Sequence, residues 1–209
     1  MRTHDLVRLA PGWIAEIAEP CIRVALERTP WAVVRRAVAP YGCTAIGVRG
    51  STRSERWPLL APHDAILACI EPEALASSVA PRTFPAFDAL AVARDAAEHA
   101  GLAWGPCGSV GFELASGAAV VHARSDCDLV IRIGTCTRAQ LHEFARALTD
   151  APARIDVQIE HDDRGYALGE LVCGSDRVLA KTRHGPRLVP LADCWRRFDE
   201  SAFRMGAAR

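Results

Sequence analysis

The chain has 209 residues, half of them hydrophobic, so it can bury one large core or two small ones and is not a disordered tail. Its 25 basic and 25 acidic side chains cancel. This balance excludes the global field that draws proteins non-specifically onto nucleic acid or anionic membranes. We therefore expect no nucleic-acid or membrane partner, and any anionic ligand must be met by local charge.

The cysteines and the start of the chain bear on its compartment. The eight cysteines are scattered, with no CxxC pair and no His/Cys cluster at zinc spacing, so they are expected to be free thiols. Polar residues follow Met1, and no apolar run approaches the roughly 18 residues of a membrane-spanning helix. A reducing, cytoplasmic location is predicted.

In the first part of the chain, residues 31–38 and 44–48 contain Val and Ile and predict short strands. The charged stretch 49–57 follows, and a short helix is expected from Glu71 to Ala76. The prolines at 81 and 85 break any periodic element. We therefore place a domain boundary there, between a smaller N-terminal α/β domain of residues 1–84 and a second domain of residues 85–209.

Beyond this boundary, helices and strands alternate. The expected helices cover residues 86–100, 110–115, 166–173 and 191–203, and a further helix has Leu141, Phe144, Ala145 and Leu148 on one face. The expected strands cover residues 126–133, 154–160 and 178–181. Gly101 is expected to end the first of these helices, and Thr137 to Gln140 read as a capping box. This order favours an α/β or α+β fold.

Three aspartates on the predicted strands are the best candidates for chemistry. Asp126 and Asp128 are two residues apart on one strand, so both side chains leave the same face, and Cys127 points to the other. Strict alternation in residues 154–160 puts Asp156 on a polar face that it shares with Glu160. Asp156 completes a three-carboxylate set if its strand lies beside the first.

Carboxylates this close repel one another, and a divalent cation relieves the repulsion. Mg²⁺ fits because it prefers oxygen ligands and takes one or two protein carboxylates together with substrate phosphates; Mn²⁺ is the alternative. Asp126, Asp128 and Asp156 are therefore the predicted metal ligands and catalytic residues. Asp156 is also placed to accept the proton of an attacking nucleophile.

Gly108 and Ser109 come immediately before a predicted helix. Glycine permits close backbone approach, and the free N–H groups at a helix start can meet phosphate oxygens, with the Ser109 hydroxyl in support. The alternative is an ordinary helix N-cap, just as a lone Asp-x-Asp is also common on solvated strand ends. Their succession is more informative than either motif alone.

That succession, GSVGFELASG, then SDCDLVIR, then RIDVQIE, resembles the nucleotidyltransferase superfamily. Within it, the chain resembles the malonate decarboxylase holo-acyl-carrier-protein synthases, which are phosphoribosyl-dephospho-CoA transferases. The additional resemblance lies in HDLVRL, GVRGSTRSERWP, DVQIE and VLAKTRHGPRLV. It implies a mixed sheet with flanking helices in residues 85–209 as the catalytic domain, and a substrate- and carrier-binding role for residues 1–84.

The resemblance further implies transfer of a 2'-(5''-phosphoribosyl)-3'-dephospho-CoA group from its triphosphate precursor, with release of pyrophosphate. The acceptor is a serine of the apo acyl-carrier subunit of malonate decarboxylase. Such a polyanionic substrate needs countercharge. The best local clusters of basic residues are Lys181, Arg183 and Arg187 downstream and Arg49, Arg53 and Arg56 upstream. For each of these side chains the alternative is a solvated strand end or loop.

Two other functions stay open at this point. A relative that moves a simple nucleotide such as adenylate onto a protein or small molecule would share the same catalytic face. A non-catalytic binding protein that keeps the fold is the third, although the presence of all three carboxylates speaks against it.

Overall fold

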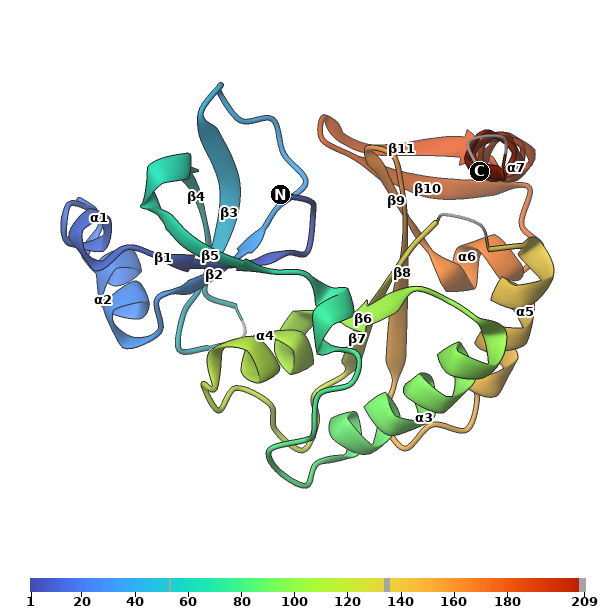
Figure 1. The fold of residues 1–209 in the computed structure, drawn as a ribbon, viewed down its shortest axis with the longest axis horizontal. Helices are drawn as coiled ribbons and strands as arrows, with labels where there is room; N and C mark the ends of the chain where they lie inside the picture. The colour runs from blue at the N-terminus through green and yellow to red at the C-terminus, as the bar shows by residue number, and fades with distance from the viewer. Residues whose placement is uncertain (53, 134–135, 207–209) are drawn as a thin grey trace.

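The computed structural model describes residues 1–52, 54–133 and 136–206. It has two β-sheets with helices on their outer sides, and the predicted α+β class is confirmed. Figure 1 shows the two sheets on opposite sides of the molecule, with α1 and α2 outside the first and α5 to α7 outside the second. No helix in the described ranges is long and apolar enough to cross a bilayer.

The first sheet comes entirely from the N-terminal third of the chain. Its strands are β1 (Leu6–Leu9), β2 (Trp31–Val34), β3 (Cys43–Arg49), β4 (Arg56–Pro62) and β5 (Ile66–Ile70), in the order β4-β3-β2-β1-β5 with antiparallel pairings. The helices α1 (Pro11–Ala15) and α2 (Pro20–Arg28) bury Ile14, Ile22 and Leu26 in its core. The short 3-10 helices η1 (His63–Ala65) and η2 (Pro72–Leu75) complete this part. The helix expected up to Ala76 is thus a 3-10 helix.

The second sheet is mixed. Its strands are β6 (Trp104–Pro106), β7 (Cys127–Arg132), β8 (Ile155–His161), β9 (Arg164–Ala167), β10 (Arg177–Thr182) and β11 (Gly185–Pro190), in the order β11-β10-β9-β8-β7-β6. Among the described residues of this sheet, the β7–β8 pairing is parallel and the others are antiparallel. The helices are α3 (Pro85–Ala100), α4 (Gly108–Ser116), α5 (Arg138–Ala147), α6 (Leu168–Val172) and α7 (Leu191–Gly206).

Local sequence signals explain several of these boundaries. Thr137 and Gln140 form the predicted capping box at the start of α5, and Gly101 ends α3 in the left-handed conformation. The predicted helix over residues 166–173 is wrong in its first part. Tyr166 and Ala167 belong to β9, because antiparallel pairing with Ile159 and Gln158 overrides the local preference.

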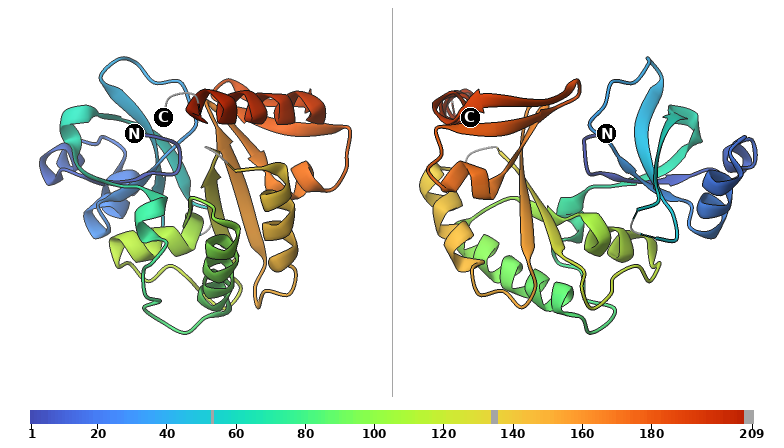
Figure 2. Two further views of the ribbon diagram at one scale, coloured as in Figure 1. Left: turned by 45° about the vertical axis from the view of Figure 1, so that its right-hand side comes forward. Right: turned by 180° about the vertical axis from the view of Figure 1, so that it is seen from behind.

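The helix α4 links the two sheets. Although it follows β6 of the second sheet, its Phe112 packs in a small cluster with Leu6 of the first sheet and with Leu75. Figure 2 shows α4, in yellow-green, below the first sheet and beside the strands of the second. The start of α4 therefore faces the space between the two sheets.

Candidate active site

A cavity of about 1060 Å³ lies between the two sheets and is lined by residues of both. Asp128, Asp156 and Lys181 line it from the second sheet, and Arg49 and Trp57 line it from the first. Five of its side chains are cationic against three carboxylates: the cations are Arg35, Arg49, Arg56, Arg154 and Lys181, and the acids are Asp128, Asp156 and Glu170. This excess of positive charge suits a polyanionic ligand.

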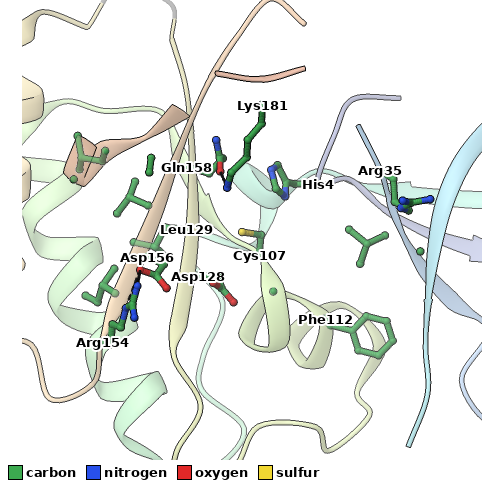
Figure 3. A pocket seen from close by; sticks show the side chains of 18 of the residues that line it. His4, Arg35, Cys107, Phe112, Asp128, Leu129, Arg154, Asp156, Gln158 and Lys181 are labelled. Atoms are coloured by element: carbon green, nitrogen blue, oxygen red, sulfur yellow. Dashed lines mark hydrogen bonds and ion pairs between the residues drawn. The ribbon is translucent and has the colours of Figure 1, made fainter. Parts of the chain in front are cut away.

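Asp128 and Asp156 are direct register partners on the parallel strands β7 and β8. Both leave the same face of the sheet and line the cavity (Figure 3). Asp126 precedes β7 instead of lying on it. Cys127, between the two aspartates, is fully buried on the opposite face, where burial and then the charge of Asp128 raise the pKa of its thiol to about 12.

Arg154 forms an ion pair with one of these two carboxylates. Its guanidinium binds Asp156 Oδ1 through Nη2 at 2.8 Å and through Nε at 3.0 Å. The hydrogen bond with Asp156 raises the pKa of Arg154, and the charges of Asp156, Asp126 and Asp128 raise it further. Arg154 therefore offsets part of the negative charge of these carboxylates.

These residues suit a cation site in which the substrate supplies further ligands. The described part of the chain contains no group of three or more His, Cys, Asp or Glu side chains arranged to hold a metal ion by themselves. Asp128 and Asp156 offer two carboxylates side by side, which is the number that Mg²⁺ commonly takes from a protein when phosphate oxygens complete its shell.

The start of α4 lies directly against Asp128. Gly108 has a φ of +58°, and a Cβ atom there would overlap the carboxylate of Asp128. The backbone N–H of Cys107 also donates to the Asp128 carbonyl at 2.8 Å. Only glycine allows this close approach, so the Gly-Ser motif and the Asp-x-Asp motif meet at one point.

Arg49 reaches the same point from the first sheet. Its Nη2 donates to Ser109 Oγ at 3.1 Å, and its guanidinium lies 5.8 Å from the centre of the Phe112 ring. Arg49 and the start of α4 at Gly108 therefore border the same part of the cavity, and Ser109 holds the Arg49 guanidinium there. A guanidinium beside the first N–H groups of a helix has the chemistry that suits an anionic group.

The structure separates the other predicted basic residues. Lys181 and Arg56 line the cavity, whereas Arg183 lines a second cavity of about 590 Å³. Arg187 is not among the described residues that line either cavity. It pairs with Ala180 across the β10–β11 hairpin, so its side chain lies on the opposite face of the sheet from Lys181. Arg53 lies outside the described residues.

Several polar side chains that line the cavity were not among the predicted site residues, including His4, Arg35, Arg154 and Gln158. Gln158 accepts a hydrogen bond of 2.7 Å from Lys181 Nζ. Alternation within β8 already placed Gln158 beside Asp156, so this residue had a usable signal. His4 and Arg35 had none, because they reach the site only through contacts distant in sequence.

Glu160, which shares its face with Asp156, belongs to a contact between the two sheets. Its buried carboxylate accepts a hydrogen bond from Arg36 Nη2 and pairs with His4 Nε2 at 3.2 Å. Burial alone raises the pKa of Glu160, but His4 and Arg36 lower it by more, so that the net pKa is below its usual value. Glu160 is therefore an ionised structural group.

The mixed α+β fold, the cationic cavity and the paired aspartates define an enzyme-like site for an anionic substrate. The comparisons with known proteins make the class specific. Residues 2–72 match the family model "Phosphoribosyl-dephospho-CoA transferase MdcG N-terminal domain", and residues 74–192 match "Phosphoribosyl-dephospho-CoA transferase MdcG C-terminal domain". The chain belongs to the phosphoribosyl-dephospho-CoA transferase family and is a transferase.

Curated relatives agree with this assignment. Phosphoribosyl-dephospho-CoA transferases of Pseudomonas putida and Pseudomonas aeruginosa are each 41% identical over 197 residues, which is 93% and 92% of this chain and 95% and 93% of theirs. That of Azotobacter vinelandii is 36% identical over 208 residues, 94% of this chain and 91% of its own. No solved structure matches the chain. The non-catalytic alternative is therefore set aside.

Proposed function

We propose that the protein transfers the 2'-(5''-phosphoribosyl)-3'-dephospho-CoA group from its triphosphate precursor to a serine of the malonate decarboxylase acyl-carrier subunit, releasing pyrophosphate. The family membership and the resemblance of the motifs support this reading. One observation carries it: a single cavity is lined by Gly108 at the start of α4, by Arg49, and by the paired carboxylates Asp128 and Asp156, with Gly108 directly against Asp128. Arg49 also donates a hydrogen bond to Ser109, the residue after Gly108.

In this reaction the serine oxygen attacks the α-phosphorus of the triphosphate. A new P–O bond forms, the bond to pyrophosphate breaks, and the serine proton passes to a carboxylate, for which we propose Asp156. The first N–H groups of α4, Ser109 and Arg49 would hold the departing phosphates in place. Such transfer depends mainly on positioning and on electrostatic stabilisation of the phosphoryl oxygens.

We propose Mg²⁺ as the cofactor, with Mn²⁺ as the alternative, and Asp128 and Asp156 as its principal protein ligands. When bound, the ion neutralises charge on the reacting phosphates. Asp126 lies close enough to contribute to the local field at Arg154. Its part in metal binding stays a prediction, as does the cytoplasmic location.

The direct test is to incubate the apo carrier subunit with the triphosphate precursor, Mg²⁺ and this protein, and to measure the carrier by intact mass spectrometry. We expect a mass increase equal to one phosphoribosyl-dephospho-CoA group, located on a serine by peptide fragmentation. One pyrophosphate should be released per carrier modified.

The matched control is the double variant Asp126→Asn, Asp128→Asn, which should lose transfer while keeping the circular dichroism spectrum of the wild type. A carrier that gains no mass with the wild-type protein would rule the proposal out. A parallel reaction with ATP in place of the precursor tests the adenylate-transfer alternative, which predicts that the carrier gains the mass of one adenylate.

A further inference from the structure

One part of the lining of the cavity is aliphatic, and we call it the aliphatic slot. We define this slot by six side chains that line the cavity and belong to the hydrophobic core or pack against it: Leu129, Ala145, Leu148, Ile155, Val157 and Leu168. They come from β7, α5, β8 and α6, and none of these side chains carries a ring or a charge. The slot is thus chemically distinct from the cationic part of the cavity.

The topology of the second sheet opens this slot. Pairing between β8 and β9 ends at Gln158 and Ala167, after which the chain turns into α6. Residues 155–157 therefore have β7 on one side and no described strand on the other. Val157 and Leu129 belong to the hydrophobic core, on the opposite face from Asp156, yet all three border the same cavity. Figure 3 shows Leu129 and Asp156 at this cavity.

The space beside Gly169, the second residue of α6, is not filled by protein atoms. This exposed glycine lines the cavity, and a Cβ atom added there would meet no atom within 4 Å. At the edge of the slot, Thr149 Oγ1 donates to the Arg146 carbonyl at 2.9 Å, so its lone pairs can accept an amide N–H. A mostly aliphatic chain with amide groups fits this combination.

The opposite wall of the cavity has a different character. Trp57 and Phe112 line it, with the Arg49 guanidinium over the Phe112 ring. Flat heteroaromatic groups prefer aromatic faces and guanidinium planes, whereas a branched aliphatic chain prefers aliphatic side chains. Dephospho-CoA contains both kinds of group, an adenine ring and a pantetheine arm with a geminal dimethyl carbon and two amides.

We infer that the aliphatic slot binds the pantetheine arm of the dephospho-CoA moiety, leaving the adenine on the Trp57 and Phe112 side. This inference rests on the proposed function for the identity of the substrate. It adds a subsite that would distinguish a substrate carrying the arm from a simple nucleotide.

Equilibrium binding of two ligands tests the inference. Dephospho-CoA carries the arm, and the β-methyl ester of ADP has the same adenosine and diphosphate charge without it. We expect the wild-type protein to bind dephospho-CoA at least about tenfold more tightly, since burying even a few methylene groups contributes this much. In Gly169→Leu, the affinity for dephospho-CoA should fall about tenfold while that for the ester stays within about twofold.

The control variant is Gly12→Leu. Gly12 is likewise the exposed second residue of a five-residue helix, with no atom within 4 Å of an added Cβ, but it does not line the cavity. It should bind both ligands as the wild type does. Melting temperatures of both variants establish that they fold. The comparison of the two ligands on the wild-type protein tests the inference even if a variant does not fold.

Equal affinity of the wild type for the two ligands, or no binding of either, would overturn the inference. An equal loss of affinity for both ligands in Gly169→Leu would also overturn it, because that result would place the adenine in the slot. Because these measurements need neither the triphosphate nor the carrier, they separate the two proposals. If this protein prefers dephospho-CoA as described but leaves the carrier unmodified, the subsite is supported and the proposed function is contradicted.

Discussion

Arg132 and Glu160 are register partners on the parallel strands β7 and β8, four residues beyond Asp128 and Asp156 on the same face. Each of them binds the N-terminal part of the chain. Arg132 pairs with Asp5 at 2.8 Å and with Glu73 at 2.7 Å, and Glu160 pairs with Arg36 and His4. One face of the second sheet thus carries the candidate catalytic carboxylates at one end and an ionic contact with the first sheet at the other.

This contact should contribute strongly to stability. Glu160 is 6% exposed and Arg36 is 11% exposed, so Glu160→Ala leaves a guanidinium poorly solvated and without its partner. Breaking a buried ion pair in this way typically costs about 3–5 kcal/mol. We expect a loss of this order in the free energy of unfolding, measured by urea denaturation.

The control for this prediction is Glu27→Ala, which removes the exposed partner of Arg23. It should change the unfolding free energy by less than about 0.5 kcal/mol. Similar small losses in both variants would show that the contact between the sheets is energetically unimportant.

Glu113 predicts a specific dependence of stability on pH. Burial by itself raises its pKa, but hydrogen bonds from Arg82 and from the N–H groups of Val121 and Val120 outweigh this effect and lower the pKa below the ordinary value of about 4.5. The folded state therefore favours the ionised carboxylate. The resulting stabilisation is fully present above pH 4.5 and is lost as the pH falls through the folded-state pKa.

The variant Glu113→Gln should accordingly lose roughly 2–3 kcal/mol at pH 7, as expected for hydrogen bonds to a charged group. The difference from the wild type should shrink as the pH falls below 4.5. Unfolding curves at pH 7, 5, 4 and 3 measure it, and a difference that stays constant across this series would show that the ionised form carries no extra stabilisation.

Gly108 should be required by its contact with Asp128 as well as by its backbone conformation. Gly117 gives the matched comparison, because its φ of +73° is equally left-handed but a Cβ there would meet no atom within 4 Å. Both alanine variants should lose roughly 1 kcal/mol of stability from backbone strain. Only Gly108→Ala should also lose carrier modification, by at least about a hundredfold, because it displaces Asp128. Equal activity of the two variants would contradict the assigned role of Asp128.

Arg154 should compete with a bound cation for Asp156. Removing it in Arg154→Ala frees the carboxylate that it now binds, so we expect the Mg²⁺ concentration for half-maximal activity to fall several-fold. A titration of carrier modification against Mg²⁺ measures this shift. An unchanged or higher requirement would indicate that Asp156 does not take part in binding the metal.

The amino-acid sequence alone was sufficient for those features that depend on local spacing. The alternation of residues 154–160 predicted that Asp156, Gln158 and Glu160 share a face opposite Val157, and β8 confirms it. The capping box at Thr137 and the glycine stop at Gly101 were predicted in the same way, because their physics is confined to one helical turn.

Tertiary structure decided which of these residues meet. Arg49 reaches Ser109 across sixty residues, and Glu160 binds Arg36 and His4 instead of lining the site with Asp156. Arg187 and Lys181 are close in sequence, but the register of the β10–β11 hairpin places them on opposite faces of the sheet. Strand alternation specifies a side-chain face but not the neighbour across that face. The neighbour is set by long-range pairing and by the packing of two sheets whose contacts no local pattern encodes.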